Sequence, residues 1–212
     1  TATRRILGWV LAAVLGSLLV GAAAWMYLDR PQTIADIALT GPRSPAPLDV
    51  VILLDESGSF DAYAKAREAT IEQLSVWAPQ NLRPDDTVTV ISFASGAAVR
   101  LPMTPVGQLP HAQFDRGVDF DRVGTDILPA LALAADLTSA QHRALIAVTD
   151  TDVWEADPSE ADRFATQIRA TSLSAVLPHG ERTRDQWKEM FPWGREFWAD
   201  PNSADEVSLA LG

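Results

Sequence analysis

The sequence contains no cysteine and only three histidines among its 212 residues. The absence of cysteine excludes both a disulfide scaffold and a thiolate metal site, and it leaves no trace of the redox state of the compartment. The three histidines, His111, His142 and His179, lie far apart and show no metal-ligand spacing. We therefore expect them to be surface or loop residues and not catalytic groups.

Motifs of several large enzyme classes are also missing. There is no Gly-x-Ser-x-Gly nucleophile elbow, no Gly-x-Gly-x-x-Gly fingerprint and no phosphate-binding loop, so hydrolase, dehydrogenase and NTPase functions lack support. Positive charge is scarce, with 17 Lys and Arg against 28 Asp and Glu, which gives a net charge of −11. Residues 1–30 have a net charge of +2, so the remaining residues have a net charge of −13. Such an acidic body argues against nucleic acid as a partner.

Residues 6–28 form an uncharged, largely apolar run near the start of the chain. As a helix this run spans about 35 Å, enough to cross the hydrocarbon core of a bilayer, so we predict one transmembrane helix there. Arg4 and Arg5 precede the run, and only Asp29 and Arg30 follow it closely. The positive-inside tendency then places residues 1–5 in the cytoplasm and the remainder on the periplasmic or extracellular side of the cytoplasmic (inner) membrane.

A cleaved signal peptide is the competing interpretation of the same run. The three alanines at 22–24 offer a small-residue cleavage site after a basic start and an apolar stretch. The run is longer than a usual signal core, however, and continues through Trp25 to Leu28. We therefore favour the anchor.

Residues 29–47 follow the predicted anchor and are rich in proline. Pro31, Gly41, Pro42, Pro45 and Pro47 favour an extended tether over a helix. We expect one globular domain over residues 48–212, which is long enough to bury a sizeable core.

Apolar runs and amphipathic patterns alternate along this domain. Strands are expected at 50–54, 87–93, 144–149 and 173–177, with a short or edge strand at 97–103. Helices are expected from Tyr63 until Pro79, at 126–137, at 157–169 and after Ser203, with irregular structure at 105–122. This alternation predicts an α/β fold with a doubly wound, mostly parallel sheet and helices on both faces.

Two carboxylates directly follow predicted buried strands, Asp55 after 50–54 and Asp150 after 144–149. In doubly wound sheets the ligand site lies at the carboxyl ends of the strands, so both point to one place. In the segment Asp55-Glu56-Ser57-Gly58-Ser59 a carboxylate is followed by two hydroxyls, and such hard oxygen donors suit Mg²⁺, Mn²⁺ or Ca²⁺. Taken alone, the segment could also be a helix N-cap cluster.

The chain resembles the von Willebrand factor type A (VWA) family over roughly 48–212. That family's metal-ion-dependent adhesion site (MIDAS) combines an Asp-x-Ser-x-Ser loop, a distant threonine and a distant aspartate. Here the loop is at 55–59, the threonine lies in Gly124-Thr125-Asp126-Ile127, and the aspartate lies in Val148-Thr149-Asp150. The resemblance implies a Rossmann-like VWA fold and one divalent cation, Mg²⁺ before Mn²⁺ or Ca²⁺, held by Asp55, Ser57, Ser59, Thr125 and Asp150.

By that resemblance, the two serines bind the cation directly, Thr125 binds it directly or through water, and the two aspartates act mainly through water. Two carboxylates and three hydroxyls leave the cation under-neutralised, so a carboxylate from a partner protein would complete its shell.

Several residues next to these five ligands also bear on the shape of the site. Thr151 and Asp152 follow Asp150 where many family members have glycine, which could reshape the loop. We keep Asp152 and Asp126 as candidates for contacts around the ligands. Alternation along the loop predicts that Glu56 points to solvent.

An aromatic cluster lies near the C-terminus, at Trp187, Phe191, Trp193, Phe197 and Trp198. It could be a partner-binding patch. Core and edge packing is the preferred interpretation, because aromatic side chains usually serve burial first.

Three functions remain open. The first is a non-enzymatic, membrane-anchored module that binds an acidic residue of a partner protein through the cation. The second is a structural accessory subunit of a larger membrane complex, for example an energy-transducing one, whose metal site is structural or vacant. A metal-assisted hydrolase is the weakest, because no general base or nucleophile accompanies the five ligands.

Overall fold

The computed structural model describes residues 33–40, 45–115, 120–137, 142–153, 157–200 and 202–211. The chain divides into two compact units, Thr1–Gln32 and Thr33–Gly212, and every element below belongs to the second. The predicted span at 6–28 lies outside the described residues. Among the helices of the described ranges, none combines the length and apolar character needed to cross a membrane.

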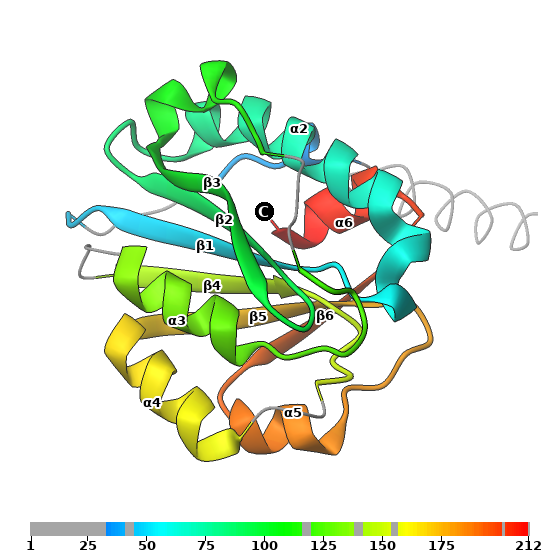
Figure 1. Cartoon of the computed structure of the whole chain (residues 1–212). Coiled ribbons are helices and arrows are strands. Elements are labelled where there is room, and N and C mark those ends of the chain that lie inside the picture. The colour runs from blue at the N-terminus through cyan, green and yellow to red at the C-terminus, as the bar shows by residue number, and fades with distance from the viewer. Residues whose placement is uncertain are drawn as a thin grey trace, which may run out of the picture. The chain divides into compact units, whose positions relative to one another are not determined.

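Six strands form one sheet: β1 (Leu48–Asp55), β2 (Thr87–Phe93), β3 (Ala97–Pro105), β4 (His142–Val148), β5 (Ala170–Pro178) and β6 (Arg195–Ala199). Their order across the sheet is β3-β2-β1-β4-β5-β6 (Figure 1). All neighbouring pairs are parallel except β2 with β3, which are antiparallel. The predicted mostly parallel sheet is confirmed, and the proline-containing strand lies at its edge.

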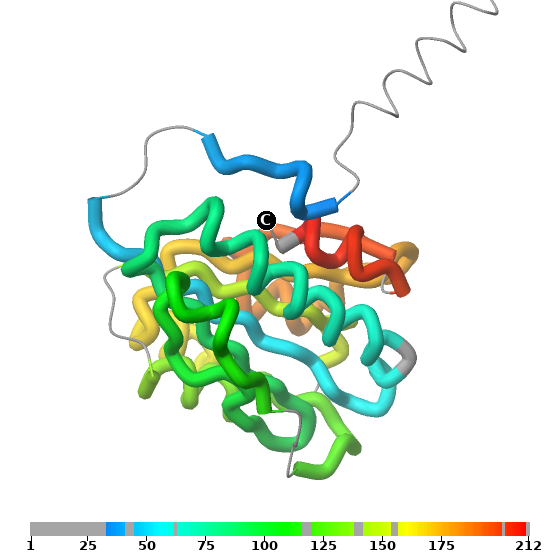
Figure 2. The backbone as a smooth tube through the Cα atoms, turned by 90° about the horizontal axis from the view of Figure 1, so that it is seen from above, coloured from blue at the N-terminus to red at the C-terminus, as the bar shows by residue number. Residues whose placement is uncertain are grey.

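Helices cover both faces of this sheet (Figures 1 and 2). One face packs against α2 (Ala64–Asn81) and α6 (Ala204–Leu211), together with the 3-10 turns η1 (Ile34–Asp36) and η3 (Val106–His111). The other face packs against α3 (Leu128–Leu137), α4 (Pro158–Ile168) and α5 (Asp185–Met190). A further 3-10 turn, η2 (Gly58–Tyr63), links β1 to α2. The doubly wound arrangement is as predicted.

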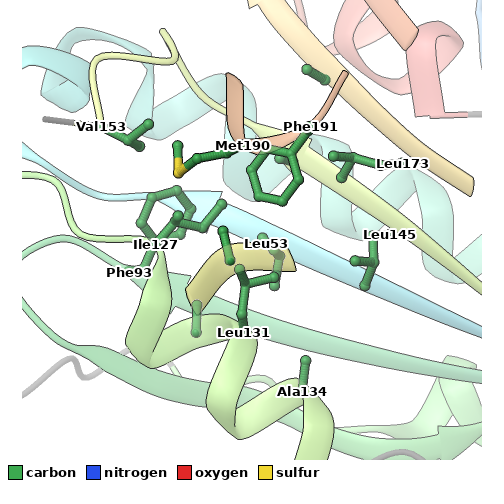
Figure 3. Close-up of a cluster of buried hydrophobic side chains, with 14 of the residues drawn as sticks. Leu53, Phe93, Ile127, Leu131, Ala134, Leu145, Val153, Leu173, Met190 and Phe191 are labelled. Carbon is green, nitrogen blue, oxygen red and sulfur yellow. The ribbon is translucent and has the colours of Figure 1, made fainter. Parts of the chain in front are cut away.

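Strand β1 contributes to two separate apolar cores. Leu53 belongs to the cluster that Figure 3 shows, with Phe93 and Leu131. Ile52 faces the other way and packs in the cluster that contains Leu74 of α2. A strand buried on both faces has no polar side, which explains the continuous apolar run in its sequence. Each fully buried side chain of this size contributes about 1.5–3 kcal/mol.

The structure corrects two expectations about local elements. Pro79 does not end α2, which continues to Asn81, because Leu82 N still donates to Ala78 O at 2.7 Å and proline removes only one donor. The segment expected to be irregular contains η3, and the sequence reading missed both α5 and β6.

The folded unit also begins earlier than the predicted domain boundary at Leu48. Ile34 is buried, Trp77 Nε1 donates to Ile37 O at 2.8 Å, and Leu39 N donates to Asn81 Oδ1 at 3.1 Å. Residues 33–40 of the predicted tether therefore pack against α2, because Ile34 gains burial there and the backbone finds hydrogen-bond partners.

Candidate metal centre

The predicted ligands follow the carboxyl ends of adjacent strands. Strands β1 and β4 run parallel, with Leu54 opposite Val148. Asp55 ends β1 and Asp150 lies two residues beyond the end of β4, so both carboxylates reach the same edge of the sheet.

Side-chain contacts join four of the five predicted residues. Ser57 N donates to Asp55 Oδ1 at 2.9 Å, and Ser57 Oγ lies 3.1 Å from Ser59 Oγ. Ser59 Oγ donates to Asp150 Oδ2 at 2.9 Å, across 91 positions of sequence. A continuous chain of oxygen contacts therefore runs from the loop after β1 to the loop after β4.

Thr125 reaches this end of the sheet through its loop. Gly58 N donates to Arg122 O at 2.9 Å, and Asp126 N donates to Ala94 O at 2.7 Å, so contacts on both sides of Thr125 hold the loop. Gly124 has a φ of +90°, a conformation that glycine adopts without steric cost. Thr125 itself is buried. The hydrogen bonds given above link the other four predicted ligands within the described ranges and do not include the Thr125 side chain.

Asp55 is the most deeply placed of the five, with no exposed surface. Burial raises its pKa to about 6, although hydrogen bonds from Ser57 and from Thr149 Oγ1, which donates to Oδ2 at 2.7 Å, act in the opposite direction. The charge of Asp150 raises this pKa further. No salt bridge to either aspartate occurs in the part of the chain that the structure describes.

This arrangement fits a small divalent cation. A buried carboxylate without a basic partner gains from a nearby positive charge, and hydroxyl and carboxylate oxygens are the donors that Mg²⁺ and Ca²⁺ prefer. The described residues hold no group of three or more His, Asp or Glu side chains suited to a metal. A cation here would thus depend on the serine and threonine hydroxyls as much as on the two carboxylates.

Glu56 does not point to solvent, contrary to the expectation from alternation. It is buried, and its Oε1 accepts from Ser92 Oγ at 2.6 Å and from Arg100 at 2.5 Å. Arg122 lies 3.4 Å from Oε2. A carboxylate can be buried when cations and hydrogen bonds compensate it, and sequence spacing alone does not reveal partners from distant strands.

Arg67 lies in the first turn of α2. It is buried, donates to Asp55 O and to Phe60 O (3.2 Å for the latter), and lies over the Phe60 ring at 5.5 Å from the centroid. Burial lowers its pKa, while Glu56 and Asp55 raise it. Its role is to hold the turn that carries the two serines.

Thr151 preserves the loop conformation where the family often has glycine. Its φ is +63°, in the left-handed region that glycine favours, and its Oγ1 accepts from Arg184 N at 3.1 Å. Asp152 N donates to Asp150 Oδ1 at 3.0 Å and so orients that carboxylate. Asp126, in contrast, accepts from Leu128 N at 2.9 Å at the start of α3, as a helix cap does.

The aromatic cluster is divided between core and surface. Trp187 and Phe191 are buried, with ring centroids 4.8 Å apart, as the packing interpretation expects. Trp193, Phe197 and Trp198 are 40%, 40% and 47% exposed, on and beside the edge strand β6. Burial therefore explains only two of the five.

Residues 50–152 match the family model described as the von Willebrand factor type A domain, and this range contains all five predicted ligands. This part of the chain is thus similar to a von Willebrand factor type A domain. VWA domains are generally non-catalytic modules for adhesion or protein interaction. A search of curated proteins gives no match.

Solved structures with the same fold have low sequence identity. BatB from Bacteroides thetaiotaomicron is 19% identical over 77% of this chain and 97% of its own, with a TM-score of 0.53. The pilus adhesin SpaC from Lactobacillus rhamnosus GG is 15% identical over 82% and 30%, with a TM-score of 0.55. Proximal thread matrix protein 1 from the mussel byssus, with a zinc-occupied MIDAS motif, is 15% identical over 78% and 46%, with a TM-score of 0.53.

Proposed function

We propose that this chain is a membrane-anchored, metal-dependent protein-interaction module that binds an acidic residue of a partner protein through one divalent cation. Mg²⁺ is the preferred cation, with Mn²⁺ and Ca²⁺ as alternatives. The proposal refines the general function of VWA domains as interaction modules.

The convergence of oxygens around Asp55 carries the proposal. Ser57, Ser59 and Asp150 meet in one chain of contacts beside a buried carboxylate that forms no salt bridge among the described residues. A site built only to cap a helix would not need Asp150 from the loop after β4. The metal in the mussel protein's MIDAS motif is further support.

Ser57 and Ser59 would hold the cation directly, and Asp55 and Asp150 would bind it chiefly through water. When bound, the cation would supply an under-neutralised position for an acidic side chain of the partner. Arg67 holds the turn that aims the serines, and Thr149 orients the Asp55 carboxylate.

The anchor and the location form part of the same proposal. Residues 6–28 would cross the cytoplasmic membrane, with residues 1–5 in the cytoplasm and the domain on the periplasmic or extracellular side. The folded unit begins at Thr33, so only residues 29–32 separate the predicted span from the domain. Partners would accordingly include membrane-complex subunits close to the bilayer.

Cation binding is the first test, measured by calorimetric titration of Mg²⁺ into the full chain in mild detergent. Asp55→Ala should abolish binding, because it removes the central carboxylate. Asp85→Ala is a matched control, since Asp85 is an exposed carboxylate paired with Arg83 at the other end of the sheet. Failure of the unmodified chain to bind Mg²⁺, Mn²⁺ and Ca²⁺ would overturn the proposal.

Partner capture separates this function from that of an accessory subunit. The full chain would be purified from membranes with Mg²⁺ or with chelator, and accompanying proteins identified by mass spectrometry. Partners lost with chelator and with Asp55→Ala support metal-mediated binding. Partners kept in both conditions, but lost when residues 6–28 are replaced, would instead identify a structural subunit of a membrane complex.

A further inference from the structure

Arg122 links the loop that carries Thr125 to the loop that carries the two serines. Its backbone carbonyl accepts from Gly58 N at 2.9 Å. Its guanidinium donates to Asp61 Oδ1 and lies 3.4 Å from Glu56 Oε2. One residue, three positions before Thr125, thus contacts the segment 56–61 at three points.

Glu56 gives Arg122 a fixed point of attachment. Glu56 lies between Asp55 and Ser57 in sequence, and its other oxygen is held by Ser92 and Arg100. Arg100 is almost fully buried and also pairs with Glu68 at 2.6 Å. The Glu56 carboxylate is thus held from the interior, whereas the Arg122 side chain is 44% exposed and lies at the outer end of the network.

Hydrogen bonds hold the Thr125 loop to the end of β2. Val123 N donates to Asp121 Oδ1 at 3.0 Å, and the carbonyl of Asp121 accepts from both Ser95 N and Ser95 Oγ. Asp126 N donates to Ala94 O. These contacts fix the side of the loop that faces β2, while among the described residues the hydrogen bonds from this loop to the segment 56–61 all come from Arg122.

The distance between the two loops matters most for a small cation. Mg²⁺ requires near-octahedral geometry at about 2.0–2.1 Å, whereas Ca²⁺ accepts irregular shells at about 2.3–2.6 Å. A loop free to drift by a few tenths of an ångström would therefore lose Mg²⁺ before Ca²⁺. The contacts of Arg122 between the two loops limit how far their spacing can change, and so affect Mg²⁺ more than Ca²⁺.

We propose that Arg122 is a positioning residue that holds Thr125 at the spacing required for Mg²⁺ and thereby makes the site selective for Mg²⁺ over Ca²⁺. This inference rests on the proposed function, because it requires a cation at the five ligands. It concerns the ratio of two affinities, which a residue of purely structural importance would leave unchanged.

The test compares Mg²⁺ and Ca²⁺ dissociation constants of the full chain in detergent, measured by calorimetric titration. Arg122→Gln should weaken Mg²⁺ binding about 10-fold, the low end of the range for residues that support metal ligands, and change Ca²⁺ binding much less. Arg122→Lys should recover only part of the Mg²⁺ affinity, because an ammonium group is a point charge and cannot bridge two carboxylates as a guanidinium does.

Two further variants keep the result interpretable. Arg83→Gln removes a part-exposed arginine that pairs with Asp85 far from the site, so it should leave both affinities unchanged. Asp61→Asn removes only the outer arm of the Arg122 contact and should shift the Mg²⁺ to Ca²⁺ ratio in the same direction by a smaller factor. It gives a second reading even if Arg122→Gln folds poorly.

The outcomes distinguish the two claims. An unchanged ratio in both Arg122→Gln and Asp61→Asn, in a chain that binds Mg²⁺ through Asp55, would overturn the role of Arg122 and leave the proposed function intact. Equal weakening of Mg²⁺ and Ca²⁺ also overturns it. Absence of cation binding by the unmodified chain would instead remove the proposed function, and this inference with it.

Discussion

Strand β1 buries an aspartate near each of its ends, and among the described residues only one of the two forms a salt bridge. At the amino end, Asp49 lies 3.5 Å from Arg143 Nε and accepts from Thr87 Oγ1. At the carboxyl end, Asp55 accepts only from uncharged donors of Ser57 and Thr149. Both side chains are nearly inaccessible, so burial does not explain the difference.

The difference separates a closed end of β1, at Asp49, from an open end, at Asp55. A buried carboxylate is tolerated when a cation compensates the loss of solvent, and Arg143 provides that charge from β4. At the other end Asp55 has no salt bridge among the described residues, and only the charge of Arg67 nearby acts in the compensating direction. Amino ends of strands in doubly wound sheets serve the fold, while carboxyl ends serve ligands.

Breaking the closed end should have the largest effect. Arg143→Met leaves Asp49 buried without its cation, so the unfolding free energy should fall by about 3–5 kcal/mol. Urea unfolding of the full chain in detergent measures this loss. Adding Asp49→Asn to Arg143→Met should restore part of the stability. If the double variant is no more stable than Arg143→Met alone, lost packing and not charge is responsible.

The open end should respond to pH in the opposite sense from an ordinary ion-paired aspartate. The pKa of Asp55 is raised from 3.8 to about 6, so the cost of burying its ionised form is absent below about pH 4, grows as the pH rises, and reaches its full size above about pH 6. Without metal, the domain should therefore lose on the order of 2–3 kcal/mol from this group as the pH rises through that window.

Asp55→Asn isolates this contribution from the other titrating groups. In chelator, the stability of the unmodified chain relative to the variant should decline between pH 4 and pH 7.5. Parallel pH profiles for the two proteins would show that burial of Asp55 carries no such penalty.

A divalent cation should compensate the buried charge of Asp55 at the open end and leave the contacts of Asp49 at the closed end unchanged. Excess Mg²⁺ at about 30 times its dissociation constant should stabilise the domain by about 2 kcal/mol at pH 7.5. The gain should shrink near pH 5, because protons compete for Asp55. Thermal unfolding at both pH values measures this, and the gain should persist in Thr87→Val, which alters only the closed end.

The smallest effect is expected from the hydroxyl donors at the two ends. Thr149→Val removes the hydrogen bond to Asp55 Oδ2 and should lower Mg²⁺ affinity by about 1 kcal/mol, roughly 5-fold. Thr87→Val removes the matching donor to Asp49 Oδ1 and should reduce stability without changing Mg²⁺ affinity. Equal Mg²⁺ affinities in the two variants would contradict the assignment of the open end as the metal site.

The sequence predicted the parts of this comparison that depend on local pattern. The apolar run before Asp55 specified a doubly buried strand, and the alternation of strands and helices specified the mostly parallel sheet. It missed α5 and β6, where aromatic residues obscured both periodicities, and it placed Glu56 in solvent. Charged residues read as exposed unless their partners are known, and those partners come from distant segments.

By itself, therefore, the sequence determined the fold class and predicted which oxygens could hold a cation, because buried strands and loop residues leave short-range signatures. Only the tertiary structure decided that Ser59 meets Asp150, that Arg143 and not Arg67 neutralises an aspartate of β1, and that Arg122 ties the two loops together. These contacts join residues roughly 60 to 95 positions apart. They follow from the parallel pairing of β1 with β2 and β4, which brings the ends of those strands to one edge of the sheet.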